Sequence, residues 1–114
     1  MAVTSNLVLD QGSDFSITIN YNNEDGSSKN LSGYTARSQM RRSYYSTTAT
    51  TLTANISDAS NGEITLSLAA NTTANLKAGR YVYDLEVVTG NSVVRVVEGI
   101  ITVLPEVTKW QIEL

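Results

Sequence analysis

The sequence predicts an all-β fold, an antiparallel β-sandwich of roughly seven to eight short strands with at most one short helical turn. Three observations support this prediction. Apolar and polar residues alternate with a period of two along most of the chain. Turn-forming clusters recur roughly every 8–12 residues, and β-branched residues are abundant beside a single Pro. The 114 residues are expected to form one domain.

The alternation is clearest over residues 15–21, after a shorter run at residues 7–9. The inward positions of the clear strand are Phe15, Ile17, Ile19 and Tyr21. A polar turn over residues 22–28 precedes a strand over residues 35–42. One face of that strand holds Ala36, Ser38 and Met40. Residues 43–51 are expected to form a polar loop.

The middle of the chain contains a predicted hairpin. An Asn-Gly pair separates alternating runs at residues 52–56 and 64–68, which is a strong signal for a tight turn between strands. Residues 69–76 are the one helical candidate, and the Asn71 side chain is expected to cap that turn. Two strands follow, over residues 80–88 and 93–103.

In the last strand the apolar phase shifts around Gly99, which predicts a β-bulge there. The preceding strand opens with Gly79-Arg80-Tyr81-Val82-Tyr83, at the place of the Gly-x-Tyr-x-Cys run of immunoglobulin strand F. Tyr81 is expected to form a tyrosine corner, and Tyr83 to replace the cysteine in the core. We therefore predict an immunoglobulin-like sandwich over residues 1–108, with a jelly roll or small barrel as the alternative.

The side chains that most enzymes use for proton transfer and nucleophilic attack are missing. The chain contains no His and no Cys, which removes the commonest general base and the thiolate nucleophile. No nucleophile elbow, phosphate-binding Gly loop or dinucleotide fingerprint occurs. We expect no catalytic residues, no metal and no cofactor.

Two carboxylates are candidates for hydrolysis of glycosides, which requires a pair of acids. Asp84 and Glu86 share the outer face of their predicted strand, and Arg37 and Arg41 share the matching face of its expected neighbour. A cross-strand ladder of opposite charges is the simpler interpretation. Asp25 lies in an acidic turn that could offer a calcium ligand, but the Asp-x-Asp-x-Asp-Gly spacing is missing and an ordinary turn is expected.

Charge and hydropathy indicate neither nucleic acid nor a membrane as partner. The formal net charge is −3 and the pI is about 4.7, so a basic footprint for nucleic acid is missing. No apolar run approaches the roughly 20 residues that span a bilayer. Residues 1–6 lack the basic and apolar regions of a signal peptide. With no cysteine, folding in a reducing cytosol is expected.

The tail, residues 109–114, is the first of three candidate contact surfaces. Its apolar residues alternate along one side: Trp110, Ile112 and Leu114. The tail either packs on its own sandwich or docks as an added strand on a partner or another copy. We favour docking.

The other two candidates are a loop and a strand face. The loop combines Arg42, Tyr44 and Tyr45 with Ser and Thr, a mixture typical of adaptable binding surfaces. The strand face is more apolar than contact with solvent requires, and carries Val82, Val88, Val93 and Val97.

Four segments carry a resemblance to a known family. They are Leu7-Val8-Leu9-Asp10-Gln11-Gly12-Ser13-Asp14-Phe15, Asn30-Leu31-Ser32-Gly33-Tyr34-Thr35-Ala36, Ala78-Gly79-Arg80-Tyr81-Val82-Tyr83-Asp84-Leu85, and Val97-Glu98-Gly99 with Pro105-Glu106-Val107-Thr108. Together they resemble small virion proteins of tailed bacteriophages, chiefly those of phages infecting marine cyanobacteria. They are also similar to the N-terminal anchoring domains of some phage baseplate and receptor-binding proteins. The resemblance spans residues 7–108.

The resemblance implies a virion component that is made in the bacterial cytosol and acts through protein–protein contacts. As a single domain, the chain is expected to be a capsid decoration protein or a neck, tail or baseplate subunit. Its expected partners are other virion proteins or further copies of itself. The alternative is a carbohydrate- or receptor-binding adhesive module on the virion surface that uses the Tyr44-Tyr45 loop.

Overall fold

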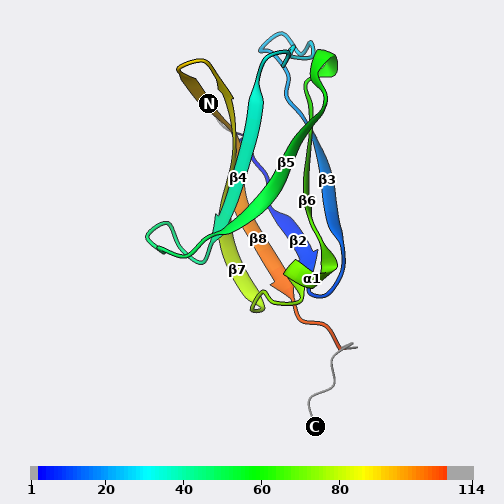
Figure 1. The fold of residues 1–114 in the computed structure, drawn as a ribbon, viewed down its shortest axis with the longest axis vertical. Coiled ribbons are helices and arrows are strands. Elements are labelled where there is room, and N and C mark those ends of the chain that lie inside the picture. The colour runs from blue at the N-terminus through cyan, green and yellow to red at the C-terminus, as the bar shows by residue number, and fades with distance from the viewer. Residues whose placement is uncertain (1–2, 108–114) are drawn as a thin grey trace.

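The computed structural model describes residues 3–107 (Figure 1). Most of them belong to eight strands: β1 (Val3–Thr4), β2 (Leu7–Asp10), β3 (Phe15–Asn20), β4 (Thr35–Arg41), β5 (Thr50–Asp58), β6 (Glu63–Leu68), β7 (Gly79–Thr89) and β8 (Ser92–Leu104). The helical segments are single turns: η1 (Ala59–Asn61) and α1 (Ala70–Thr73). Within the described range, no helix has the length and apolar character needed to cross a bilayer.

The strands form two facing sheets, as in an immunoglobulin-like sandwich. In the larger sheet β8 lies between β7 and the N-terminal strands β1 and β2, and β4 lies on the far side of β7. In the smaller sheet β6 lies between β5 and β3. The predicted all-β sandwich is confirmed. One detail differs, because β1 and β2 run parallel to β8 while the other neighbouring pairs are antiparallel.

Strand β5 belongs to both sheets. Its first residues pair with β4, with Leu52 opposite Ser38, and its later residues pair with β6. Figure 1 shows β5 passing from the side of β4 to the side of β6. The strand begins at Thr50, inside the stretch predicted to be loop, because Thr50 pairs with Met40.

The core between the sheets is made of the inward residues of the alternating pattern. Those with at most 1% of their surface exposed are Leu9, Leu31, Met40, Leu52, Ile64, Leu66, Leu85, Val87, Ile101 and Val103. Burying a side chain of this size stabilises the fold by roughly 1.5–3 kcal/mol. The predicted inward faces of β3, β4 and β7 all contribute to this core.

Two tyrosines on β7 confirm the predicted roles of this strand. The Tyr81 hydroxyl donates a hydrogen bond to the Lys77 carbonyl at 2.8 Å, which is the tyrosine corner. Tyr83 is 4% exposed and fills the place of the immunoglobulin cysteine. Its hydroxyl also donates to the Ser5 carbonyl at 2.7 Å and so fastens the N-terminal segment to the larger sheet.

The β-bulge in β8 exists, but the predicted position was wrong. Leu85 pairs with Val97 whereas Glu86 pairs with Arg95, so Val96 is the extra residue. As a result Val97, predicted on an outer face, is 5% exposed in the core. Gly99 has a different purpose: a Cβ there would lie 2.2 Å from the Ser5 carbonyl oxygen, so glycine permits the close approach of the N-terminal segment.

The predicted cap of the helical turn was also wrong. The turn begins after Ala69, so Asn71 lies inside it and its side chain is not at the capping position. The Asp14 carboxylate, from the residue just before β3, accepts the Ala70 N–H at 2.8 Å instead. A remote residue thus supplies the cap, which a local sequence rule does not detect.

Candidate functional site

A shallow groove of about 560 Å³ lies on the outer face of the larger sheet. It is lined mainly by outward residues of β4, β7 and β8, with Tyr44 from the β4–β5 loop. Its charged residues are Arg37, Arg41, Asp84, Glu86, Arg95 and Glu98. Three are basic and three are acidic, so the formal charge of the lining is zero.

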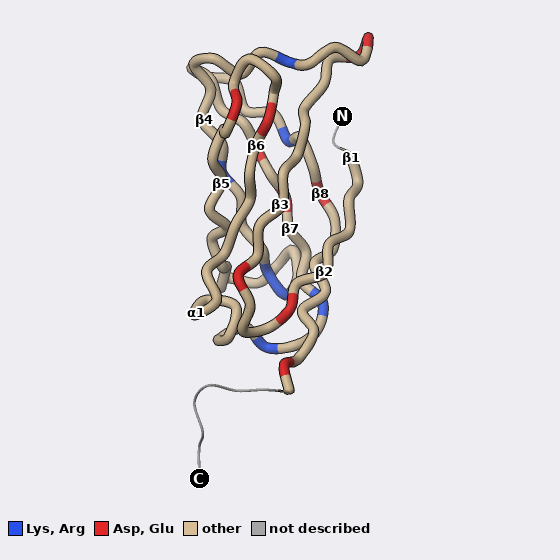
Figure 2. Tube along the Cα trace, turned by 90° about the vertical axis from the view of Figure 1, so that its right-hand side faces the viewer, with Lys and Arg blue, Asp and Glu red and all other residues tan. Residues whose placement is uncertain are grey.

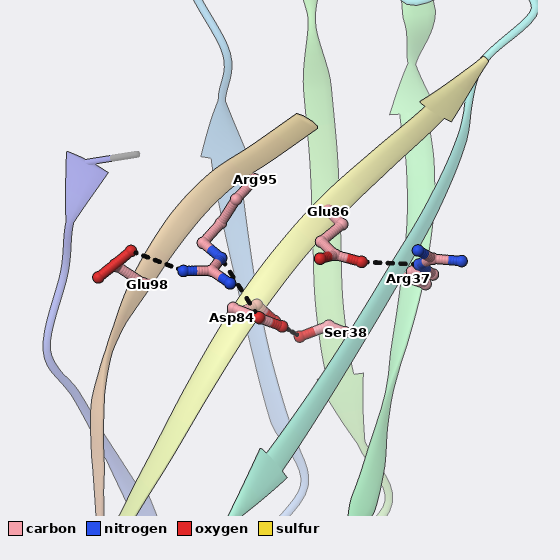
Figure 3. Close-up of polar contacts among 6 residues, drawn as sticks. All are labelled: Arg37, Ser38, Asp84, Glu86, Arg95 and Glu98. Carbon is pink, nitrogen blue, oxygen red and sulfur yellow. Dashed lines mark hydrogen bonds and ion pairs between the residues drawn. The ribbon is translucent and has the colours of Figure 1, made fainter. Parts of the chain in front are cut away.

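Ion pairs connect most of these charges across the strands (Figure 3). Arg37 Nε lies 2.8 Å from Glu86 Oε1, which confirms the predicted pairing of β4 with β7 at this position. Arg95 bridges two acids: its Nε lies 3.5 Å from Asp84 Oδ2, and its Nη1 lies 3.3 Å from Glu98 Oε2. These pairs hold the guanidinium and carboxylate groups of three strands on one surface.

The bulge at Val96 allows Arg95 to reach both acids, because it brings Arg95 and Glu98 to the same face of β8. Without it, Arg95 would share the inward phase of Val97 and the rest of β8. Because the bulge inserts one residue, Arg95 and Glu98 both face outward although three positions separate them. The charged lining of the groove therefore includes Arg95 and Glu98, which the sequence analysis did not predict as site residues. The sequence does contain a signal for this: Arg95 shares the phase of the inward residues Ile101 and Val103, and a charged residue in that phase indicates a bulge between them.

Arg41 does not join the ladder, contrary to the prediction. The antiparallel register places Arg37 opposite Glu86 but Arg41 opposite Val82, since Asp84 faces Gln39. Arg41 instead has a partner in the loop that follows β4 and another on its own strand. Its Nη1 donates to the Ser46 carbonyl at 2.6 Å, and its Nη2 donates to Gln39 Oε1 at 3.0 Å.

The loop bonded by Arg41 positions the two predicted contact tyrosines differently. The Ser46 N–H donates to the Ser43 carbonyl at 3.2 Å, which closes a turn around Tyr44 and Tyr45. Tyr44 is 76% exposed and lines the groove. Tyr45 is 95% exposed and is not part of the lining. Substitution of Tyr44 therefore tests a contact in the groove, and the same substitution at Tyr45 serves as its control.

Asp84 is the acid most affected by this environment. Burial raises the pKa of its carboxyl, repulsion from Glu86 adds to the rise, and Arg95 partly opposes it. Among the described residues its carboxylate has one ion pair, the long contact of 3.5 Å with Arg95. The Ser38 hydroxyl donates to the Asp84 main-chain carbonyl and fixes this part of β7 (Figure 3). The carboxylate retains capacity to accept bonds from a ligand.

Arg42, a predicted contact residue, interacts with its own chain. Its guanidinium carbon lies 5.0 Å from the centroid of the Tyr81 ring, and its Nη1 donates to the Ala78 carbonyl at 3.4 Å. Arg42 thus braces the tyrosine corner. The other predicted contact residues, Trp110, Ile112 and Leu114, lie outside the described residues.

An apolar strip borders the groove on the same outer face. Val82 on β7 lies opposite Ile100 on β8, and Val8 on β2 lies opposite Thr102, between Ile100 and Leu104 on that face. Val8, Leu104 and Ile100 are 63%, 44% and 37% exposed. Of the predicted apolar face, Val82, Val88 and Val93 lie on this outer side of the sheet, whereas the bulge turns Val97 inward.

The acidic turn at Asp25 is closed by its own chain. Asp25 Oδ1 accepts the Ser27 N–H at 2.9 Å and the Ser27 hydroxyl at 2.6 Å. These hydrogen bonds hold the pKa of the Asp25 carboxyl below its usual value. Over residues 3–107, no three potential ligands of the His, Cys, Asp or Glu type come together to hold a metal ion.

Comparison with known proteins assigns no function to this surface. The sequence matches no family model and no curated protein. Among solved structures, a family 123 glycoside hydrolase from Clostridium perfringens is similar over 90% of this chain, with a TM-score of 0.40 and 15% identity. This chain spans 23% of that enzyme's chain. A likeness of this strength identifies neither an activity nor a ligand for the present chain.

Proposed function

We propose that this chain is a non-catalytic structural protein of a tailed-phage virion that acts through protein–protein contacts. A capsid decoration protein or a neck, tail or baseplate subunit fits this proposal. Its partners are other virion proteins. The resemblance in the four sequence segments supports the setting, and one structural observation supports a choice of contact surface.

That observation is the apolar strip of Val8, Val82, Ile100 and Leu104 on the larger sheet. Its residues come from three adjacent strands and leave large aliphatic side chains in contact with solvent. The ion-paired groove borders it. An apolar centre with a polar border is typical of protein interfaces, and contiguous apolar surface on a soluble domain often marks a binding site.

The test is incorporation of the chain into phage particles. Val8→Lys combined with Ile100→Lys places two charges in the strip, so we expect loss of the protein from purified particles, measured by quantitative mass spectrometry. Thr18→Lys, on the outer face of the smaller sheet, is the matched control and should be incorporated like the wild type.

Both variants alter exposed positions, and circular dichroism should verify that they fold. Absence of the wild-type chain from purified particles would refute the virion assignment. Normal incorporation of the double variant would refute the role of the strip.

A further inference from the structure

We propose that the groove on β4, β7 and β8 binds a neutral oligosaccharide. This proposal does not depend on the virion setting, because it concerns the groove, which shares only Val82 with the apolar strip, and a different class of ligand. Three properties of the groove carry it: its charge balance, its hydrogen-bonding groups and its aromatic rim.

The charge balance disfavours an ionic ligand. Three guanidinium groups would attract a phosphate or sulfate, but three carboxylates lie among them and would repel it. A cation meets the opposite obstacle. A ligand without net charge gains from both sets of groups and is repelled by neither.

The hydrogen-bonding groups match hydroxyls. A sugar hydroxyl both donates and accepts, so one hydroxyl can donate to a carboxylate while it accepts from a guanidinium. The pairs Arg37–Glu86 and Arg95–Asp84 offer these two functions side by side. Asp84 has the greater remaining capacity, since its one ion pair is long. Hydrogen bonds to charged groups are stronger than those between neutral groups.

The aromatic rim supplies an apolar surface for the C–H faces of a sugar ring. Tyr44 lines the groove with most of its side chain exposed, and Val82 adds an aliphatic contact. The bond from Arg41 to the Ser46 carbonyl holds the Tyr44 turn in place before any ligand arrives. Such preorganisation reduces the entropy lost on binding.

The size and shape of the groove favour a chain of sugars over a single unit. Its volume of about 560 Å³ lies within the range of roughly 300–1,000 Å³ that is usual for ligand sites. It is partly open to solvent along the sheet surface, so a chain of sugars can extend beyond it at the open side.

The experiment is an NMR titration of the ¹⁵N-labelled full chain with four neutral probes: maltohexaose, cellohexaose, xylohexaose and mannohexaose. At least one probe is expected to shift the amide signals of the groove residues on β4, β7 and β8. Tyr44→Ala should weaken that binding at least about tenfold. Tyr45→Ala, the exposed neighbour outside the lining, should change it less than about twofold.

Three outcomes would overturn the proposal. The first is the absence of groove shifts with all four probes at millimolar concentration. The second is equal binding by wild type and Tyr44→Ala, when the variant's spectrum shows an intact fold. The third is tighter binding of a sulfated oligosaccharide than of its neutral counterpart. Loss of virion incorporation by the strip variants would bear on none of these, so the two proposals fail separately.

Discussion

The outer faces of the two sheets differ although the same alternating pattern builds both. The larger sheet presents the ion-paired groove and the apolar strip. The smaller sheet presents rows of small polar residues in register: Ser16, Ser67 and Thr53 in one row, and Thr18, Thr65 and Asn55 in the next. In the view of Figure 2, the middle stretches of β3 and β6 carry no charged residue.

The two outer faces show which residues a solvent-exposed strand needs and which residues go beyond that need. Ser and Thr on an outward face are compatible with a strand and introduce no partly buried charge. The larger sheet instead places Asp84 where burial raises its pKa, next to two further acids. Perturbed carboxyls in a groove are more typical of functional surfaces than of structural ones. The contrast therefore makes the outer face of the larger sheet the first place to test for binding.

The largest expected effect comes from truncating core residues, and it tests whether the two sheets differ only on their outer faces. Leu85 lies behind the charged face and Leu66 behind the polar face, and both are 0% exposed. Truncation of either to Ala should lower the free energy of unfolding by about 2–5 kcal/mol, measured by urea denaturation. If only one variant is destabilised, the inner faces differ as well and the contrast is not confined to the surface.

A smaller effect concerns the N-terminal segment, which braces the larger sheet alone. Tyr83→Phe removes the hydrogen bond to Ser5 and should cost about 0.5–1.5 kcal/mol in urea unfolding. Tyr21→Phe, beside β3 of the smaller sheet, is the control and should stay within about 0.5 kcal/mol of wild type.

The contribution of Tyr83 to stability should also depend on pH in the alkaline range. Burial raises the pKa of Tyr83 above its ordinary value of 10.0, so the folded state holds this proton more tightly than the unfolded chain. The stabilisation is therefore fully present below pH 10.0 and is lost as pH rises through the higher folded value. The advantage of wild type over Tyr83→Phe should shrink above pH 10.0; a constant difference would contradict this account.

The smallest expected effect concerns Asp84 itself. Its pKa is raised from 3.8, so the ionised form that exists at neutral pH is the form that the fold disfavours. Asp84→Asn should stabilise the domain at pH 7 by less than about 1 kcal/mol, because the side chain is partly exposed and Arg95 loses a partner. The gain should vanish as the pH falls to the usual carboxyl value. Thr65→Asn on the smaller sheet should show no such pH dependence.

Local patterns were sufficient to predict most of the fold. Alternation identified the inward residues of β3, β4 and β7, and the spacing of Gly79, Tyr81 and Tyr83 predicted the tyrosine corner because its hydrogen bond spans four residues. The parallel pairing of β1 and β2 with β8 was not predictable in this way. It joins residues about ninety positions apart and depends on the close approach that Gly99 permits.

The site was predictable only in part. Arg37 and Glu86 were paired correctly because immunoglobulin topology makes their strands neighbours. The position of Glu98 beside Arg95 depends on where the bulge falls: a bulge at Gly99 would turn Glu98 toward the core, whereas the bulge at Val96 turns it outward. The division between Tyr44 and Tyr45 depends on a turn closed by a side chain from the preceding strand, which no local rule contains.

Strand β5 has a consequence for how the domain comes apart. One continuous strand hydrogen-bonds to β4 at its start and to β6 at its end, so the two sheets are joined through the backbone and not only through the core. Pulling them apart therefore requires that β5 lose its pairing with β4 or with β6, in addition to opening the apolar core.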